Sequence, residues 1–322
     1  MNQVAATTEL NTVFDDCEIL KKELLDGLKA KDKYINPKFF YDEYGSQLFE
    51  KIMQLPEYYP SRTEIALLKQ FQTEISETVG VGKVLIEPGA GNCEKVQYLL
   101  PMLKPDCYMP IDISADFLFE CAKKLQDDFP KIKIHAVADD MKADVIVPKK
   151  FRNNDKVIFY PGSTIGNYQP ADALGFLKHA RKLVGRKGGL LIGVDLQKDK
   201  DILNAAYNDE EGITALFNLN ILNHVNNLLG SDINVELFEH VSFYNEKLSR
   251  IEMHLESQTE HKSNIDEFSE VTFSEKERIH TEYSYKYTID SFSELAAQAG
   301  LKLKKFWLDD KKLFSIQYYV VC

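Results

Sequence analysis

The fold is decided by the stretch Lys83-Val84-Leu85-Ile86-Glu87-Pro88-Gly89-Ala90-Gly91-Asn92. Its apolar run predicts a buried strand, and the Gly-x-Gly turn that follows lets backbone approach a ligand closely, because glycine has no Cβ. A dinucleotide-binding motif has a third glycine where this chain has Glu94, so the pattern disfavours NAD. An ordinary tight turn in a βα unit explains the same residues when they are considered alone.

Short β-rich runs alternate with helical patterns around this turn. Strands are expected over 83–87, 108–113, 133–137, 156–160 and 189–195. The helical patterns include one that Ser61 and Glu64 introduce as a capping box and another over 171–184. This alternation predicts an α/β fold with a doubly wound, mostly parallel sheet.

The rest of the chain predicts a second unit and a return to the first. Residues 201–229 have a helical pattern, and 234–257 alternate as strands do; a helix over 291–299 then precedes strands over 301–308 and 314–321, which form an antiparallel hairpin at a sheet edge. We expect one domain from 61–196 and 288–322. A second, α+β domain from 1–60 and 197–287 covers its mouth, with the active site between them.

Composition excludes several classes of function. The net charge of −11 and the absence of a basic stripe argue against nucleic acid as a partner. No apolar run is long enough to span a membrane, and the first ten residues lack a signal or transit pattern, so a cytoplasmic protein is expected. The five cysteines and seven histidines have no metal-binding spacing, which predicts reduced thiols and no metal site. A monomer is the default expectation.

Acidic residues stand at the ends of three successive predicted strands. Glu87 precedes the glycine turn, Asp112 ends the second strand, and Asp139 and Asp140 end the third. Asp112 can accept both hydrogen bonds of a ribose diol, Asp140 can accept from an adenine amino group, and Met141 can pack on the ring. The pattern favours an adenosyl pocket and adenosylmethionine, which has no pyrophosphate. Aspartates that only cap the following helices are the alternative.

The fourth strand ends in Tyr160-Pro161-Gly162-Ser163-Thr164-Ile165-Gly166-Asn167-Tyr168. Its small residues let a substrate approach backbone carbonyls, and the Asn167 amide offers both a donor and an acceptor. This combination suits a zwitterionic ligand such as an amino acid. A simple turn around Asn167 is the alternative.

Several blocks resemble the histidine-specific methyltransferases of ergothioneine biosynthesis. The resemblance covers residues 15 to 322, and its blocks are 40–49, 55–64, 161–167, 204–209, 250–253 and 281–284. It implies a Rossmann-like class I methyltransferase fold and adenosylmethionine as cofactor. It also implies Nα-methylation of L-histidine in three transfers, giving the betaine hercynine.

The resemblance also implies roles for individual residues. The implied catalytic residues are Tyr41, Gly162 and Asn167, of which Tyr41 and the carbonyl of Gly162 hold the α-amine. For the substrate, it implies that Asn167 and Tyr207 bind the carboxylate. The imidazole contacts are Tyr58, Glu282 and Ser284, and the pocket walls are Phe49 and Met253. The cofactor-binding set is Tyr41, Gly89, Lys95, Asp112, Asp140 and Met141.

Glu282 is the candidate for specificity, because a carboxylate can accept a hydrogen bond from an imidazole N–H. The chain departs from the family at Pro88, Ala90, Asn92 and Cys93 in the glycine turn, and at Tyr283 beside Glu282. Three alternatives therefore stay open. These are a different amino acid as acceptor, methylation of an imidazole nitrogen, and a catalytically silent regulator that binds adenosylmethionine.

Overall fold

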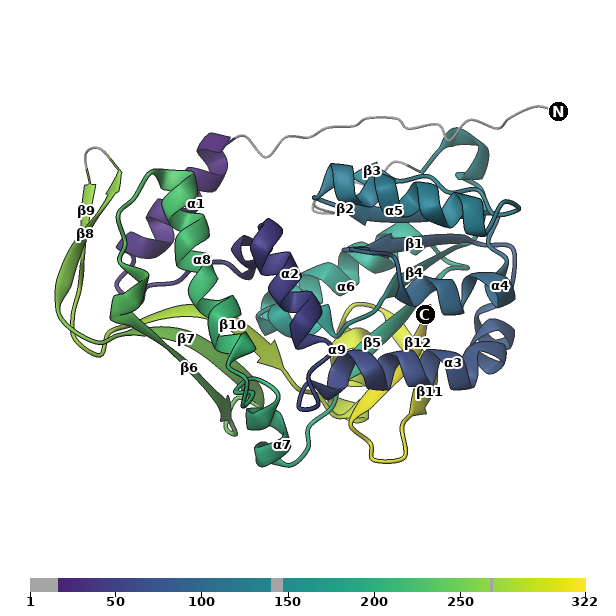
Figure 1. Cartoon of the computed structure of the whole chain (residues 1–322). Helices are drawn as coiled ribbons and strands as arrows, with labels where there is room; N and C mark the ends of the chain where they lie inside the picture. Colours follow the sequence, from purple (N-terminus) through teal and green to yellow (C-terminus); the bar gives the residue numbers. More distant parts are fainter. Residues whose placement is uncertain (1–16, 140–146, 267–268) are drawn as a thin grey trace.

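A seven-stranded sheet forms the centre of the larger part of the molecule (Figure 1). The computed structural model describes residues 17–139, 147–266 and 269–322. The strand order is β11-β12-β5-β4-β1-β2-β3; β1 to β5 run parallel, while β12 is antiparallel to both β5 and β11. This confirms the mostly parallel sheet with an antiparallel C-terminal hairpin. The strands are β1 Val84–Pro88, β2 Cys107–Asp112, β3 Val137–Ala138, β4 Lys156–Tyr160, β5 Gly189–Asp195, β11 Leu301–Leu308 and β12 Phe314–Val321.

Helices cover both faces of this sheet. In β4, Val157 and Phe159 pack towards one face, and Ile158 and Tyr160 towards the other. Both sets are buried, as expected for a parallel strand between two helical layers. The first face is covered by α3 Tyr59–Val79, α4 Leu100–Leu103 and α5 Ala115–Asp128, and the second by α6 Pro170–Val184 and α9 Ile289–Gln298.

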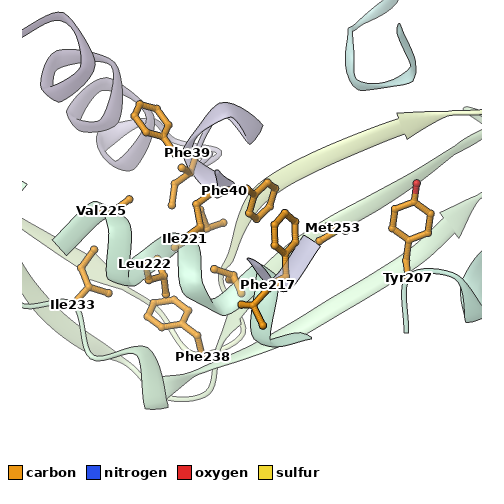
Figure 2. Packing of buried hydrophobic residues seen from close by; sticks show 14 of the residues in the cluster. Phe39, Phe40, Tyr207, Phe217, Ile221, Leu222, Val225, Ile233, Phe238 and Met253 are labelled. Atoms are coloured by element: carbon orange, nitrogen blue, oxygen red, sulfur yellow. The ribbon is translucent and has the colours of Figure 1, made fainter. Parts of the chain in front are cut away.

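A smaller antiparallel sheet, β10-β7-β6, lies beside the large one (Figure 1). Helix α8 packs on it through Phe217, Ile221 and Leu222, with Phe40 stacked on Phe217 (Figure 2). The smaller part of the molecule contains this sheet, the helices around it and a separate hairpin of β8 and β9. The elements are α1 Cys17–Lys29, α2 Glu43–Ile52, α7 Lys200–Ala205, α8 Ile213–Leu229, β6 Phe238–Asn245, β7 Arg250–Ser257, β8 His261–Asp266, β9 Ser269–Phe273 and β10 Arg278–Tyr285.

Short 3₁₀ helices complete the described chain: η1 Pro37–Phe40, η2 Lys95–Tyr98, η3 Lys149–Phe151, η4 Thr164–Asn167 and η5 Val235–Leu237. Within the described ranges, no helix combines the length and the apolar character needed to cross a bilayer.

Three local expectations were wrong. The helix expected at Ser61 begins at Tyr59 with no side-chain cap, because Glu64 is buried and bonds elsewhere. The helical pattern over 201–229 is two helices, since the Asp209 carboxylate accepts from the backbone of Ile213 and Thr214 and so caps a new start. The third strand is short, and the hairpin of β8 and β9 had no counterpart in the sequence expectations.

Candidate active site

The glycine turn after β1 faces open space. Gly89 has φ +63° and Gly91 has φ +51°, and a Cβ added to either would meet no protein atom within 4 Å. The Gly91 N–H donates to Asp112 Oδ2 at 2.9 Å, and the Ser114 N–H donates to Oδ1 at 3.0 Å. Each carboxylate oxygen keeps a lone pair for a further donor. The turn and Asp112 thus form one cradle, with open space above the turn and free acceptor capacity on the carboxylate.

Glu87 lies within the sheet behind this cradle. Its side chain is buried and accepts a hydrogen bond from the Tyr108 hydroxyl at 2.6 Å. Burial raises the pKa of Glu87 to about 8, although the hydrogen bond from Tyr108 opposes the shift. Asp139 follows β3, and its N–H donates to the Asp112 carbonyl at 3.1 Å. The predicted cofactor contacts Asp140 and Met141 lie outside the described residues.

Glu64 joins the loop after β4 to the helix after β1. Its carboxylate accepts from the Gly162 N–H at 2.9 and 3.0 Å and from Lys95 Nζ at 2.6 Å. Gly193 in β5 leaves the room for this carboxylate, because a Cβ there would overlap Glu64 Oε1. The predicted cofactor contact Lys95 and the predicted amine contact Gly162 are therefore held together by a buried residue that the sequence analysis had placed in a helix cap.

The loop after β4 packs closely against β10. A Cβ on Gly166 would lie 2.9 Å from the Tyr285 carbonyl oxygen and 3.6 Å from Ser284 Oγ. Only glycine therefore permits this approach. It brings the neighbouring Asn167 to the strand that carries Glu282 and Ser284.

Aromatic rings from several elements form one contiguous cluster. Tyr41 contacts Phe49 edge-on with ring centroids 5.6 Å apart, and Phe49 contacts Tyr58 edge-on at 6.2 Å. Tyr58 in turn lies 6.3 Å from Tyr207. The ring centroid of Phe217 in α8 lies 5.9 Å from the ring centroids of both Tyr41 and Phe49, so Phe217 packs against the cluster. The structure brings four predicted pocket residues together and adds Phe217.

Glu282 faces this aromatic cluster from β10. It pairs across the sheet with Met253 of β7, is only 9% exposed, and receives no hydrogen bond from any of the described residues. Burial raises the pKa of Glu282 to about 7, against the opposing charge of Lys286. The 9% exposure leaves the carboxylate within reach of water or a ligand, and a carboxyl group with a raised pKa in such a position is a candidate binding group.

Tyr41 connects the aromatic cluster to the cofactor cradle. Tyr41 is 40% exposed, but the protein around its hydroxyl still raises the pKa of Tyr41 by desolvation, and Glu282, Tyr207 and Asp112 raise it further. These three residues come from the two ends of the candidate site. The Tyr41 hydroxyl thus lies within electrostatic reach of both the Glu282 pocket and the Asp112 cradle.

A buried lysine organises the far end of the pocket. Lys286 Nζ lies 2.7 Å from Asp195 Oδ2 and donates to Ser284 Oγ at 2.8 Å and to the Tyr207 hydroxyl at 3.1 Å. Tyr207 itself donates to Ser284 at 2.9 Å. The predicted carboxylate contact Tyr207 and the predicted imidazole contact Ser284 are thus direct partners.

Asp195 holds further polar groups at the same point. It accepts from the Tyr59 hydroxyl at 2.8 and 2.9 Å and from Lys198 Nζ at 2.5 Å. Burial alone would raise the pKa of Asp195, but Lys286 and Lys198 lower it below its usual value. Burial lowers the pKa of Lys198 to about 8. Asp195 therefore stays ionised between two ammonium groups.

Several of these residues were not predicted from the sequence. Asp195 ends the fifth strand, so the pattern of acids at strand ends could have identified it. Lys286 follows the 281–284 block by two residues, but a lone lysine on a strand gives no signal of burial. Phe217 belongs to an apolar helix face, where core packing is the ordinary outcome.

Comparisons with known proteins agree with this geometry. The family model described as "Histidine-specific methyltransferase, SAM-dependent" matches residues 20–321. The histidine N-alpha-methyltransferase of Mycolicibacterium smegmatis is 35% identical over 309 residues, covering 94% of this chain and 95% of that protein. Ergothioneine biosynthesis protein 1 of Neurospora crassa is 34% identical over 226 residues, covering 67% of this chain and 26% of that protein.

Solved structures agree at the level of the fold. An S-adenosylmethionine-dependent methyltransferase from Clostridium acetobutylicum superimposes with a TM-score of 0.50 at 10% identity, covering 86% of this chain and 97% of that one. The fold is therefore the Rossmann-like class I methyltransferase fold. Because the family model covers nearly the whole chain, the protein belongs to the histidine-specific, adenosylmethionine-dependent methyltransferases.

Proposed function

We propose that the protein methylates the α-amino group of L-histidine with adenosylmethionine and gives the trimethylated betaine hercynine. Membership of the family and the similarity to a histidine N-alpha-methyltransferase support this activity. The observation that carries it is Glu282, a carboxylate that is 9% exposed, receives no hydrogen bond within the described part of the chain, and lies near Tyr41, Tyr58 and Tyr207.

Glu282 supplies the specificity in this proposal. An imidazole N–H would donate to its carboxylate, with Ser284 and Tyr58 beside it. An amino acid without a donor at that position leaves the carboxylate desolvated and unpaired, which costs roughly 1–3 kcal/mol. Phe49 and Met253 form the apolar walls on either side.

The opposite end of the substrate is assigned to polar groups. Asn167 and Tyr207 bind the carboxylate, and the positive charge of Lys286 lies 3.1 Å from the Tyr207 hydroxyl. Tyr41 and the Gly162 carbonyl hold the α-amine. The amine must be neutral at attack, and Tyr41 is protonated at neutral pH because the ordinary tyrosine pKa of about 10 is raised further at this position. Tyr41 therefore orients the amine or a water and is not a strong base.

The cofactor contacts are assigned to the cradle of Gly89, Lys95 and Asp112. When bound, adenosylmethionine supplies a methyl group activated by a positively charged sulfur. The chain has to hold the amine lone pair in line with that methyl group and exclude water, since positioning contributes most of such a rate enhancement. The faces of Tyr41, Phe49 and Tyr58 favour the quaternary ammonium that forms after the third transfer.

Two units divide these tasks. One hydrophobic cluster is built from residues between 24 and 59 and between 203 and 279, and two others come from 67–194 and 292–319. We assign the cofactor to 61–196 with 288–322, and histidine to 1–60 with 197–287.

The cellular setting is proposed on chemical grounds. Cys93, Cys107, Cys121 and Cys322 are free thiols, as is usual in the reducing cytoplasm. The net charge of −11 favours a small-molecule substrate over nucleic acid. We propose a cytoplasmic enzyme that acts as a monomer.

A competition assay tests the proposed function. The protein is incubated with an equimolar mixture of amino acids and adenosylmethionine carrying a deuterated methyl group, and every product is quantified by mass spectrometry. We expect label on histidine alone, and a loss of this preference in Glu282→Gln but not in the surface control Glu270→Gln. Label on another amino acid overturns the substrate assignment. Cofactor binding without any label transfer identifies a silent regulator.

A further inference from the structure

Strand β10 has a bulge that decides where Glu282 points. His280 pairs with His254 of β7, and Glu282 pairs with the next residue, Met253, so Thr281 is the extra residue. Side chains alternate between the two faces of a regular strand, so in a strand without a bulge Glu282, two residues after His280, would share the face of His280. With the bulge, both Thr281 and Glu282 face inwards, and Glu282 reaches the aromatic pocket.

The bulge is held by a buried amide. The Thr281 hydroxyl donates to Asn218 Oδ1 of α8 at 2.7 Å, and both residues are 0% exposed. Asn218 Nδ2 donates to the His254 carbonyl at 2.9 Å, next to the bulge. The reversed amide would place two acceptor oxygens against each other, so these contacts fix its orientation.

The same amide continues to the other end of the pocket. Asn218 Nδ2 also donates to His240 Nδ1 at 2.8 Å, which leaves the proton of the neutral ring on Nε2. His240 Nε2 in turn donates to the Tyr207 carbonyl at 3.0 Å. Burial lowers the pKa of His240, which keeps the ring in this neutral form.

We infer that Thr281, Asn218 and His240 form a positioning chain that fixes Glu282 relative to Tyr207 and so sets the preference for histidine. The inference rests on the proposed function, in which these two residues bind opposite ends of the substrate. Thr281 and Asn218 are fully enclosed, and they act through Glu282 and Tyr207. Helix α8 thereby supplies two neighbouring residues: Phe217, which packs against the aromatic cluster, and Asn218, which aligns Glu282 with Tyr207.

Thr281→Val tests the chain, because it keeps the branched shape and removes only the hydroxyl. We expect the KM for histidine to rise at least tenfold, with adenosylmethionine affinity unchanged within twofold. Thr281→Ser, which keeps the donor, should lie within threefold of the wild type. The matched control is Thr272→Val on the exposed side of β9, which should change neither parameter.

A double-mutant cycle separates positioning from general destabilisation. If Thr281 acts through Glu282, adding Thr281→Val to Glu282→Gln should raise the KM less than twofold further. Should Thr281→Val lose adenosylmethionine binding, the test moves to the partly exposed His240, where His240→Leu should be non-additive with Tyr207→Phe. Additive effects, or an unchanged KM in Thr281→Val, overturn the inference. A wild-type protein that methylates no histidine overturns the proposed function instead.

Discussion

The Lys286 ammonium lies 2.7 Å from the Asp195 carboxylate, and each side chain is only 1% exposed. This pair closes the end of the pocket at Tyr207 and Ser284, and its charges have no access to water. Breaking a buried pair leaves an uncompensated charge, whereas exposed pairs contribute little. Breaking this buried pair should therefore destabilise the folded protein more than breaking an exposed pair.

We predict that Lys286→Met lowers the free energy of unfolding by about 3 kcal/mol, at the lower end of the usual range because Lys198 still faces Asp195. Histidine affinity should fall as well, since Tyr207 and Ser284 lose a donor. Urea denaturation and calorimetry measure the two effects. Lys200→Met, which breaks an exposed pair with Glu246, is the control and should change stability by less than about 1 kcal/mol. Equal losses in the two variants would contradict the assignment.

Glu282 should make stability depend on pH. Its pKa is raised from 4.5 to about 7, so the folded protein binds this proton more tightly than the unfolded chain does. The stability that Glu282 contributes is complete below pH 4.5 and is lost as the pH rises through 7. Glu282→Gln does not titrate. Between pH 5 and pH 8 its stability relative to the wild type should rise by up to about 3 kcal/mol. A difference that stays constant over this range would contradict a buried, unpaired carboxylate.

Phe49 should matter more for later methyl transfers than for the first. A cation near an aromatic face gains about 0.5–2 kcal/mol, and the amine becomes permanently charged only at the third transfer. Phe49→Leu is expected to slow the third transfer about 3- to 30-fold more than the first. Mono- and dimethylated products should therefore accumulate in a time course followed by mass. The exposed Phe306→Leu is the control. Equal slowing of every step would indicate packing alone.

Gly193→Ala tests the link between Glu64 and the cofactor side. The new methyl group would displace the Glu64 carboxylate from Gly162 and Lys95. We expect adenosylmethionine affinity to fall about tenfold and stability to fall by about 1–3 kcal/mol. Gly175→Ala in α6 meets open space and should stabilise the helix by up to about 1 kcal/mol. Unchanged cofactor affinity in Gly193→Ala would show that Glu64 has no role in binding adenosylmethionine.

The large sheet could be predicted because its signals are local. Strands over 156–160, 189–195, 301–308 and 314–321 match the structure residue for residue, since β-rich runs next to turn residues such as Gly162, Gly188 and Gly300 locate them in the sequence. The contact between the glycine turn and Asp112 followed from their positions at the ends of neighbouring strands in the same way.

The rest depends on contacts between distant residues. Glu64 is separated from Gly162 by 98 positions, so a local capping pattern was the only signal the sequence offered for it. The direction of Glu282 depends on one extra residue in β10, which alternation cannot reveal. Lys286 and Asp195 are buried only because the two sheets meet at that point.

The position of the methyl groups on the product tests the central claim most directly. Histidine is incubated with the protein and adenosylmethionine, and the product is fragmented in a tandem mass spectrometer. We predict three methyl groups on the α-nitrogen, seen as loss of trimethylamine from a product with an unmodified imidazole ring. A methyl group on a ring nitrogen would contradict the placement of the ring at Glu282 and of the amine at Tyr41.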